Sequence, residues 1–343
     1  MEKLYGIIQK LTAAPGVSGF EHASFGAMRE YLESTGMFDE IYTTPVSSIC
    51  AIMRCGRESA ELVMCDAHLD TVGFVVTEIC EGGFLRIAPV GGIAPKILQA
   101  SVVYIYGKET ITGVFGSKPP HLQATGEAEK KTEVTDLFID TGFSAEKLKE
   151  IIHVGTPVGF RGKTEKLIGT RIAGTYLDDR LCAAAILRGL MMLDKTKLTK
   201  DIAFTFTARE ETGAGGVMTV AYGLNPEYAI VSDVTNAFVP GAHKSREGVK
   251  VGKGVDICYS PKTSRRLTGR AVETARKNGV DYQLSASGGY TGTNAEDITV
   301  TRGGIPSVLF SIPLKNMHTA SEIADLKDVY GTARLVSLML CGG

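Results

Sequence analysis

Helical and strand-like segments alternate through the second half of the sequence, and this alternation constrains the fold more than any other feature. A helical pattern at residues 179–194 is followed by apolar strands at residues 201–208 and 227–233, a second helical pattern at residues 263–279 and a strand at residues 305–313. Such alternation is typical of a largely parallel sheet covered by helices. We expect a three-layer α/β/α sandwich with a mixed, largely parallel central sheet, whose functional groups lie where strands end.

A β-rich block interrupts the α/β pattern between about residues 74 and 166. Its short apolar segments, among them SVVYIYG and ITGVFG, are separated by Gly and Pro and show hardly any helical periodicity. With 343 residues, 44% of them hydrophobic, the chain is long enough for two units. We therefore predict a small β-barrel-like domain at residues 74–166, inserted into an α/β domain made of residues 1–73 and 167–343.

The composition excludes several classes of partner. Lys plus Arg number 37 and Asp plus Glu number 38, so there is no basic field for nucleic acid. No apolar run reaches the roughly 18 to 20 residues of a membrane helix, and the N-terminus lacks the features of a signal peptide. The seven cysteines show no CxxC spacing and are expected to be free thiols. We predict a cytoplasmic protein with a small, roughly neutral substrate.

The first candidate site residue is His68, in the sequence VMCDAHLDTVG at the end of an apolar strand. Asp70 lies two residues further on, on the same face of an extended segment, so its carboxylate can orient the imidazole of a metal-binding histidine. For this short motif alone, a histidine and an aspartate that satisfy each other at a strand end are the more frequent explanation.

Two pairs of adjacent acids occupy comparable positions. Asp178 and Asp179 stand at the start of a predicted helix, where N-capping is the common role, although adjacent carboxylates also suit a bridging metal ligand. Glu210 and Glu211 directly follow a buried strand, where two like charges resist desolvation unless solvent or a cation neutralises them. One glutamate can then bind a metal while the other takes a proton from water.

Two further residues complete the pattern. Asp233 ends another apolar strand, and His318 follows a strand that breaks at Pro313, just before a final helix expected to start near Ser321. Two histidines and three carboxylates thus lie at strand ends or helix starts, and no cysteine accompanies them. This set of nitrogen and oxygen donors suits Zn, Co or Mn. We predict that metal is bound by His68, Asp233, His318 and one acid of each adjacent pair.

Five short motifs occur in order along the chain: HLD at 68–70, LDDR at 177–180, EE at 210–211, DVT at 233–235 and MHT at 317–319. They resemble the motifs of the tetrahedral aminopeptidases, metallopeptidase family forty-two, whose members often carry the names glutamyl aminopeptidase or endoglucanase. The likeness runs from AAPGVSGFE through GVFGSKPPHL and FIDTGFSAE to GGYTGTNAEDITVTRGGIPSVLFSIP. It covers essentially the whole chain.

The resemblance implies an aminopeptidase with two divalent metal ions per chain, Zn or Co or Mn, that acts on peptides. Position by position, it places one ion on His68 and Asp233 and the other on Glu211 and His318. Asp178 would bridge the two ions.

The resemblance also implies roles beside the ions. Glu210 would be the general base, and Asp70 would orient His68. The peptide bond between Asp178 and Asp179 is expected to be cis. The inserted β domain, residues 74–166, would mediate dimerisation, and the dimers would assemble into a dodecameric tetrahedron.

Some positions depart from the family pattern next to the ligands. The family often has Gly at the position of Cys182, a Val-Gly pair in place of Thr212-Gly213, and His in place of Asn236. None of these departures removes a ligand, but they bear on substrate preference because such residues help to form pocket walls. A glutamyl preference would need a basic pocket residue, for which the candidates are Lys118, Arg180, Lys244 and Arg246.

Three other functions compete with the aminopeptidase. A deacylase or carboxypeptidase on the same scaffold would clamp the other end of its substrate, and near His318 the sequence offers only Lys315 for a carboxylate. Glycoside hydrolysis needs two metal-free carboxyls separated by roughly 5 to 9.5 Å, and the chain has no Trp for sugar stacking. A non-catalytic assembly protein would have no reason to keep the complete ligand set.

Overall fold

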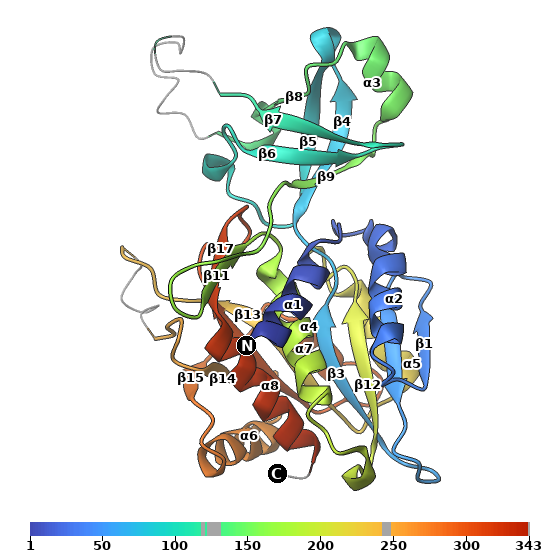
Figure 1. Ribbon diagram of the computed structural model, residues 1–343, viewed down its shortest axis with the longest axis vertical. Coiled ribbons are helices and arrows are strands. Elements are labelled where there is room, and N and C mark those ends of the chain that lie inside the picture. Colours follow the sequence, from blue (N-terminus) through green and yellow to red (C-terminus); the bar gives the residue numbers. More distant parts are fainter. Residues whose placement is uncertain (118–120, 122–131, 242–247, 342–343) are drawn as a thin grey trace.

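The chain forms an α/β sandwich and a β barrel (Figure 1). A computed structural model describes residues 1–117, 121, 132–241 and 248–341. The chain enters the barrel after β3 (Leu62–His68) and leaves it after β9 (Pro157–Phe160). The first and the last described helices, α1 (Glu2–Thr12) and α8 (Leu326–Leu340), both lie on the sandwich (Figure 1). The barrel strands are therefore inserted between strands of the sandwich.

Eight strands form the central sheet, in the order β1-β2-β12-β3-β13-β16-β14-β15. Its four middle strands, β12, β3, β13 and β16, run parallel to one another. Parallel strands with both faces covered need apolar residues at nearly every position, and β12 and β16 are buried over their whole length. The remaining bounds are β1 (Glu40–Thr43), β2 (Ile49–Met53), β12 (Asp201–Thr207), β13 (Tyr228–Asn236), β14 (Val255–Tyr259), β15 (Tyr282–Ala286) and β16 (Ser307–Leu314).

Helices cover both faces of this sheet. Leu181 and Phe204 belong to the hydrophobic core on one face, and Val217, Ile298 and Met64 belong to the core on the other. Five helices contribute side chains to the first core: α1 (Glu2–Thr12), α2 (Phe25–Ser34), α4 (Leu177–Leu190), α6 (Arg265–Lys277) and α8 (Leu326–Leu340). Two helices contribute side chains to the second core: α5 (Gly215–Leu224) and α7 (Asn294–Thr299). The predicted sandwich with a largely parallel sheet is confirmed.

The barrel closes in the order β4-β5-β8-β7-β6-β9 and has a core of its own. Burial alternates strictly along β7, so one face of the strand points inward. The ring of Phe74 lies edge-on to Phe115 and Phe160, with ring centroids 5.1 Å and 5.7 Å away. The elements are β4 (Gly73–Ile79), β5 (Phe84–Val90), β6 (Val102–Tyr106), β7 (Thr110–Phe115), β8 (Ile139–Asp140) and α3 (Ala145–Ile151).

A small third sheet joins β10 (Glu165–Lys166), β11 (Arg171–Gly174) and β17 (Glu322–Asp325). The predicted helix start near Ser321 is wrong, because β17 follows and α8 begins only at Leu326. Strand β17 pairs with β11, which lies about 150 positions earlier in the chain. A partner so distant in sequence supplies the hydrogen bonds that a local helix would otherwise have made.

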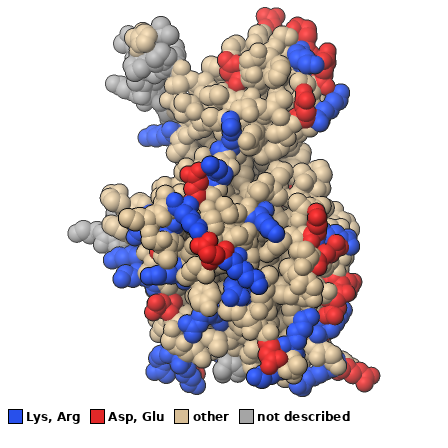
Figure 2. Space-filling view, viewed as in Figure 1, with Lys and Arg blue, Asp and Glu red and all other residues tan. Residues whose placement is uncertain are grey.

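Positive and negative side chains are interspersed over the face shown in Figure 2, without an extended area of one sign. Among the residues that the structure describes, no helix combines the length and the apolar character that crossing a membrane would require.

Candidate metal centre

The carboxyl ends of the parallel strands bring four of the five predicted ligands to one edge of the sheet. His68 is the last residue of β3, and Asp233 lies in the neighbouring strand β13. Glu210 and Glu211 follow β12, and His318 follows β16. Because these strands all point the same way, side chains far apart in sequence meet where the strands end.

The inner group of the site consists of His68, Asp178 and Asp233, all three buried. One possible ligand atom from each lies within 4.8 Å of the others. His68 Nε2 is 3.1 Å from Asp178 Oδ1 and 3.9 Å from Asp233 Oδ1. The other ring nitrogen, Nδ1, lies 2.9 Å from the main-chain oxygen of Asp70. This contact orients the ring so that Nε2 faces the carboxylates.

The outer group consists of Asp178, Glu211 and His318, whose possible ligand atoms also lie within 4.8 Å of one another. His318 Nε2 is 3.3 Å from both Asp178 Oδ2 and Glu211 Oε2. Its Nδ1 lies 2.6 Å from the main-chain oxygen of Gly92, which follows barrel strand β5. The outer group is more open than the inner one, because the His318 side chain is 27% exposed and that of His68 only 2%.

Asp178 belongs to both groups, one carboxylate oxygen facing each histidine. Asp178 and Asp179 depart from helical geometry at the start of α4, and the peptide bond between them is cis. The cis bond that the family resemblance implied is confirmed. Asp179 accepts a hydrogen bond from the His68 main-chain N–H and belongs to neither group.

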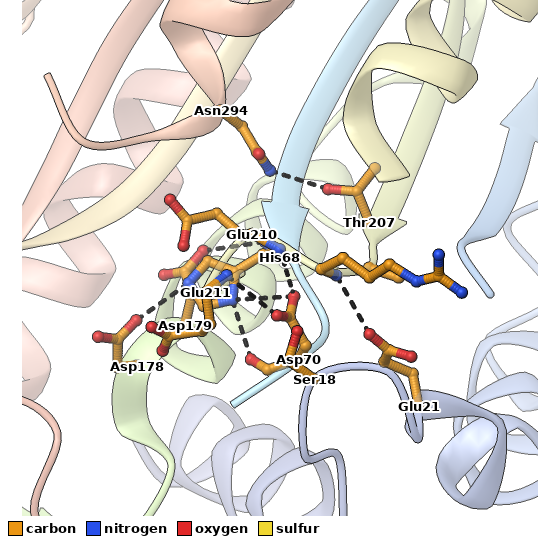
Figure 3. A network of polar contacts seen from close by, with 12 residues as sticks. Ser18, Glu21, His68, Asp70, Asp178, Asp179, Thr207, Glu210, Glu211 and Asn294 are labelled. Atoms are coloured by element: carbon orange, nitrogen blue, oxygen red, sulfur yellow. Dashed lines mark hydrogen bonds and ion pairs between the residues drawn. The ribbon is translucent and has the colours of Figure 1, made fainter. Parts of the chain in front are cut away.

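Asp70 is fully buried between His68 and the turn after β12 (Figure 3). Its two carboxylate oxygens accept the main-chain N–H groups of Glu210 and Glu211, at 3.0 Å and 3.1 Å. The carboxylate is 3.7 Å from His68 Nδ1, beyond ordinary hydrogen-bond distance. Asp70 thus orients His68 through its main-chain oxygen, while its side chain holds the two glutamates.

Two buried acids beside the site, Glu21 and Glu322, are not among the residues predicted from the sequence. Glu21 accepts the main-chain N–H of Arg209, which directly precedes the paired glutamates (Figure 3). Glu322 accepts the N–H groups of Leu177, Asp178 and His318. In the sequence Glu322 looks like an ordinary helix-start residue. Its burial in the fold, with 2% of the residue exposed, distinguishes it from an exposed residue of that kind.

Comparison with known proteins agrees with this geometry. The model of the M42 glutamyl aminopeptidase family matches residues 48–335. The chain belongs to this family. M42 members are aminopeptidases, so the chain is a peptidase and thus a hydrolase.

Relatives match this M42 chain over almost its whole length. It is 31% identical to the lysyl aminopeptidase of Pyrococcus furiosus, with 97% of this chain and 96% of the relative covered. An aminopeptidase structure from the archaeon Desulfurococcus kamchatkensis superposes with a TM-score of 0.91 at 29% identity, covering 100% of this chain and 95% of that one. The TET1 peptidase of Pyrococcus horikoshii gives 0.83 at 26% identity, with 98% and 99% covered.

A cavity of about 430 Å³ opens over both groups of this M42 site. Beyond the acids and histidines, its described lining is neutral and comes from Gly92, Val234, Thr235, Asn236, Thr291, Gly292, Thr293 and Met317. Of the departures from the family pattern, Asn236 lines this cavity, Cys182 is buried in α4, and the Thr212 hydroxyl lies 2.8 Å from that of Ser18.

The basic residues considered for substrate recognition do not line the described part of the cavity. Arg180 is fully buried, and its Nη1 donates to the main-chain oxygen of Leu11. Lys118, Lys244 and Arg246 lie outside the residues that the structure describes.

Burial and crowding set the protonation of the metal-free site. Burial, with Asp70 and Asp178 nearby, raises the pKa of Glu210 to about 7. Burial and Asp178 raise the pKa of Glu211 to about 8. Burial acts to lower the pKa of His318, but Asp178 and Glu211 outweigh it and raise this pKa to about 9. Fully ionised, the carboxylates of the site would therefore carry more negative charge than its two histidines can balance.

The donors present fit divalent cations. Each group offers one imidazole nitrogen and two carboxylates, a set that Zn, Co and Mn accept. Glu211 Oε1 is buried and, within the described part of the chain, has no hydrogen-bond partner. A cation beside this oxygen would satisfy it and offset the repulsion among the carboxylates.

Proposed function

We propose that this chain is a metal-dependent aminopeptidase that releases N-terminal residues from peptides with the help of two divalent ions. The observation that carries the proposal is the pair of ligand groups sharing Asp178, with Glu210 beside them in the same cavity. Names among the relatives, such as lysyl aminopeptidase, support peptide substrates.

The inner group, His68, Asp178 and Asp233, would hold one ion, and Glu211 and His318 would hold the second together with Asp178. Bound divalent ions would lower the pKa of water toward about 7 and polarise the scissile carbonyl. The main-chain contacts to the Nδ1 atoms of both histidines keep their Nε2 atoms directed at Asp178.

Glu210 lines the cavity but belongs to neither ligand group, so its carboxylate is free for proton transfer. We assign it the role of general base, which takes a proton from the attacking water and delivers it to the leaving amine. Asp70 fixes the backbone of Glu210 and thereby the position of this carboxylate. A pKa near neutrality suits a group that must both accept and return a proton.

Hydrolysis of aminoacyl p-nitroanilides, each with a free and an acetylated α-amine, tests the proposal. The cobalt- or zinc-loaded enzyme should cleave only the free amines. Glu210→Gln should lower kcat by roughly 10² to 10⁴, while Glu146→Gln on the barrel surface serves as the matched control. Equal cleavage of acetylated substrates would contradict the aminopeptidase and favour a deacylase or carboxypeptidase, and no cleavage at all would favour an assembly protein.

We also propose that the inserted unit, residues 74–166, mediates dimerisation and that the dimers form a larger shell. One structural neighbour is a dodecamer in its asymmetric unit, and the TET1 peptidase of Pyrococcus horikoshii can assemble into a tetrahedron or a large octahedral shell. Light scattering on the full-length chain should give a mass that is an even multiple of 36.6 kDa. A monomer would contradict this proposal without touching the proposed chemistry.

The proposed cellular location is the cytoplasm. All seven cysteines are free, and four of them are buried. Free thiols are typical of reducing compartments.

A further inference from the structure

We propose that Glu322 is a positioning residue that sets the distance between Asp178 and His318, and thereby the affinity of the outer group for its metal ion. The inference rests on the proposed function, because it assigns Asp178 and His318 to a metal. Glu322 would not touch the ion or the substrate.

Glu322 joins two segments that are far apart in the chain. Its Oε2 accepts the N–H groups of Leu177 and Asp178, at 2.7 Å and 3.2 Å. Its Oε1 accepts the N–H of His318, at 2.9 Å. One buried carboxylate thus holds the backbones of two proposed ligands from opposite sides.

Main-chain hydrogen bonds on both sides of Glu322 hold its carboxylate in a fixed position. Glu322 pairs with Gly174 across the small sheet, just before the segment that leads to Asp178. The next residue, Ile323, exchanges both main-chain hydrogen bonds with Lys315, just before the segment that leads to His318. Strand β17 therefore lies between the two ligand segments and is hydrogen-bonded to the start of each.

His318 depends on such support because its backbone has φ 63°, in the left-handed region that non-glycine residues seldom adopt. The bond to Glu322 satisfies its N–H in this conformation. Without that bond, His318 would lose one of the contacts that hold its ring nitrogen 3.3 Å from Asp178.

The chemistry of the contact predicts that an amide cannot replace the carboxylate. Both oxygens of Glu322 act as acceptors toward N–H donors. The side chain of Gln has a single acceptor oxygen, and its NH₂ group would face another donor. Glu322→Gln should therefore release one of the two segments, although the side chain of Gln has the same shape as that of Glu.

Asp328 provides a matched control. It is fully buried, and its two carboxylate oxygens likewise accept main-chain N–H groups, those of Gly252 and Gly254. It belongs to neither ligand group and does not line the cavity. Asp328→Asn makes the same chemical change as Glu322→Gln, away from the site.

The test is a titration of Co²⁺ into the metal-free full-length chain, followed by visible absorption, with Tm measured in parallel. Wild type should bind two ions. In Glu322→Gln the affinity for one ion should fall roughly 10- to 100-fold, and its absorption band should change. Asp328→Asn should have a lower Tm but wild-type affinity.

The outcomes distinguish a failure of the proposed function from a failure of the positioning role alone. If wild type binds no Co²⁺, both are overturned. If wild type binds two ions and Glu322→Gln binds them equally well, or if Asp328→Asn weakens binding as much, only the positioning role is overturned.

A second measurement on wild type applies even if Glu322→Gln fails to fold. Amide hydrogen exchange of the metal-free protein should show slow exchange at Leu177, Asp178 and His318. Exchange at the rate of an exposed loop at these three amides would show that the hydrogen bonds to Glu322 are absent and would overturn the inference.

Discussion

The two ligand groups of the site share Asp178 but are built differently. The inner group takes His68 and Asp233 from adjacent parallel strands, and both side chains are almost fully buried. The outer group takes Glu211 and His318 from segments that follow strands, and the His318 side chain is 27% exposed.

The difference shows which interactions fix each group. Strand hydrogen bonds of the central sheet hold His68 and Asp233, so these two ligands of the inner group follow from the sandwich alone. The outer group depends on contacts from elsewhere, namely Glu322 of the small sheet and the Gly92 carbonyl beside the barrel. We therefore expect the inner group to tolerate fewer changes, and the outer group to respond to changes outside the sandwich.

The largest expected effect on metal affinity comes from removing the histidine of each group. His68→Ala should lower Zn²⁺ affinity of the inner group on the order of 1,000-fold or more, because water cannot easily replace a buried ligand and the facing carboxylates lose their partner. His318→Ala should lower affinity of the outer group less, on the order of 10- to 100-fold, because solvent reaches that position. Metal content and calorimetric titration measure both, and equal losses would remove the distinction between the groups.

The pH dependence of metal binding gives the next largest effect. In the metal-free protein the pKa of Glu211 is raised to about 8 and that of His318 to about 9, so both are protonated at pH 7 and a metal ion must displace the protons. Affinity of the outer group should rise with pH from 7 to about 9 and then level off. Each displaced proton contributes about a tenfold change per pH unit.

Calorimetry in buffers of different ionisation enthalpy counts the protons released. His318→Ala should show a shallower pH dependence than wild type, because one of the two competing protons is gone. An affinity that does not change between pH 7 and 9 would contradict the charge crowding inferred for the outer group.

The smallest expected effect concerns the segment beside the barrel. Gly91 has φ 81°, and a Cβ there would lie 2.8 Å from Val72, so Gly91→Ala should shift the neighbouring Gly92 carbonyl away from His318. We expect a loss of roughly 3- to 10-fold in outer-group affinity. Gly142 also has a positive φ, 72°, but a Cβ there meets nothing within 4 Å, and Gly142 belongs to neither the ligand groups nor the cavity lining, so Gly142→Ala is the control. Titrations in which both variants match wild type would show that this segment does not support His318.

The sequence allowed most of the sandwich to be predicted, because long apolar strands and helical periodicity are local properties. The polar residues that end these strands stand out for the same reason, since His68, Glu210 and Asp233 follow apolar runs. The prediction failed at Ser321, where a strand pairs with residues about 150 positions away. Local propensity contains no information about such a partner.

By itself the sequence determined which residue types stand at the strand ends, and so the chemistry that the site can perform. The tertiary structure decided how those residues are held. Asp70 is an example. Its spacing in the sequence predicted a carboxylate that orients His68, whereas in the fold that carboxylate accepts the main-chain N–H groups of Glu210 and Glu211. Glu322 is a stronger example, because the three N–H groups that donate to its carboxylate come from two segments that are far apart in the sequence. A buried carboxylate must satisfy its oxygens with whatever donors surround it, and only the packed fold defines those donors.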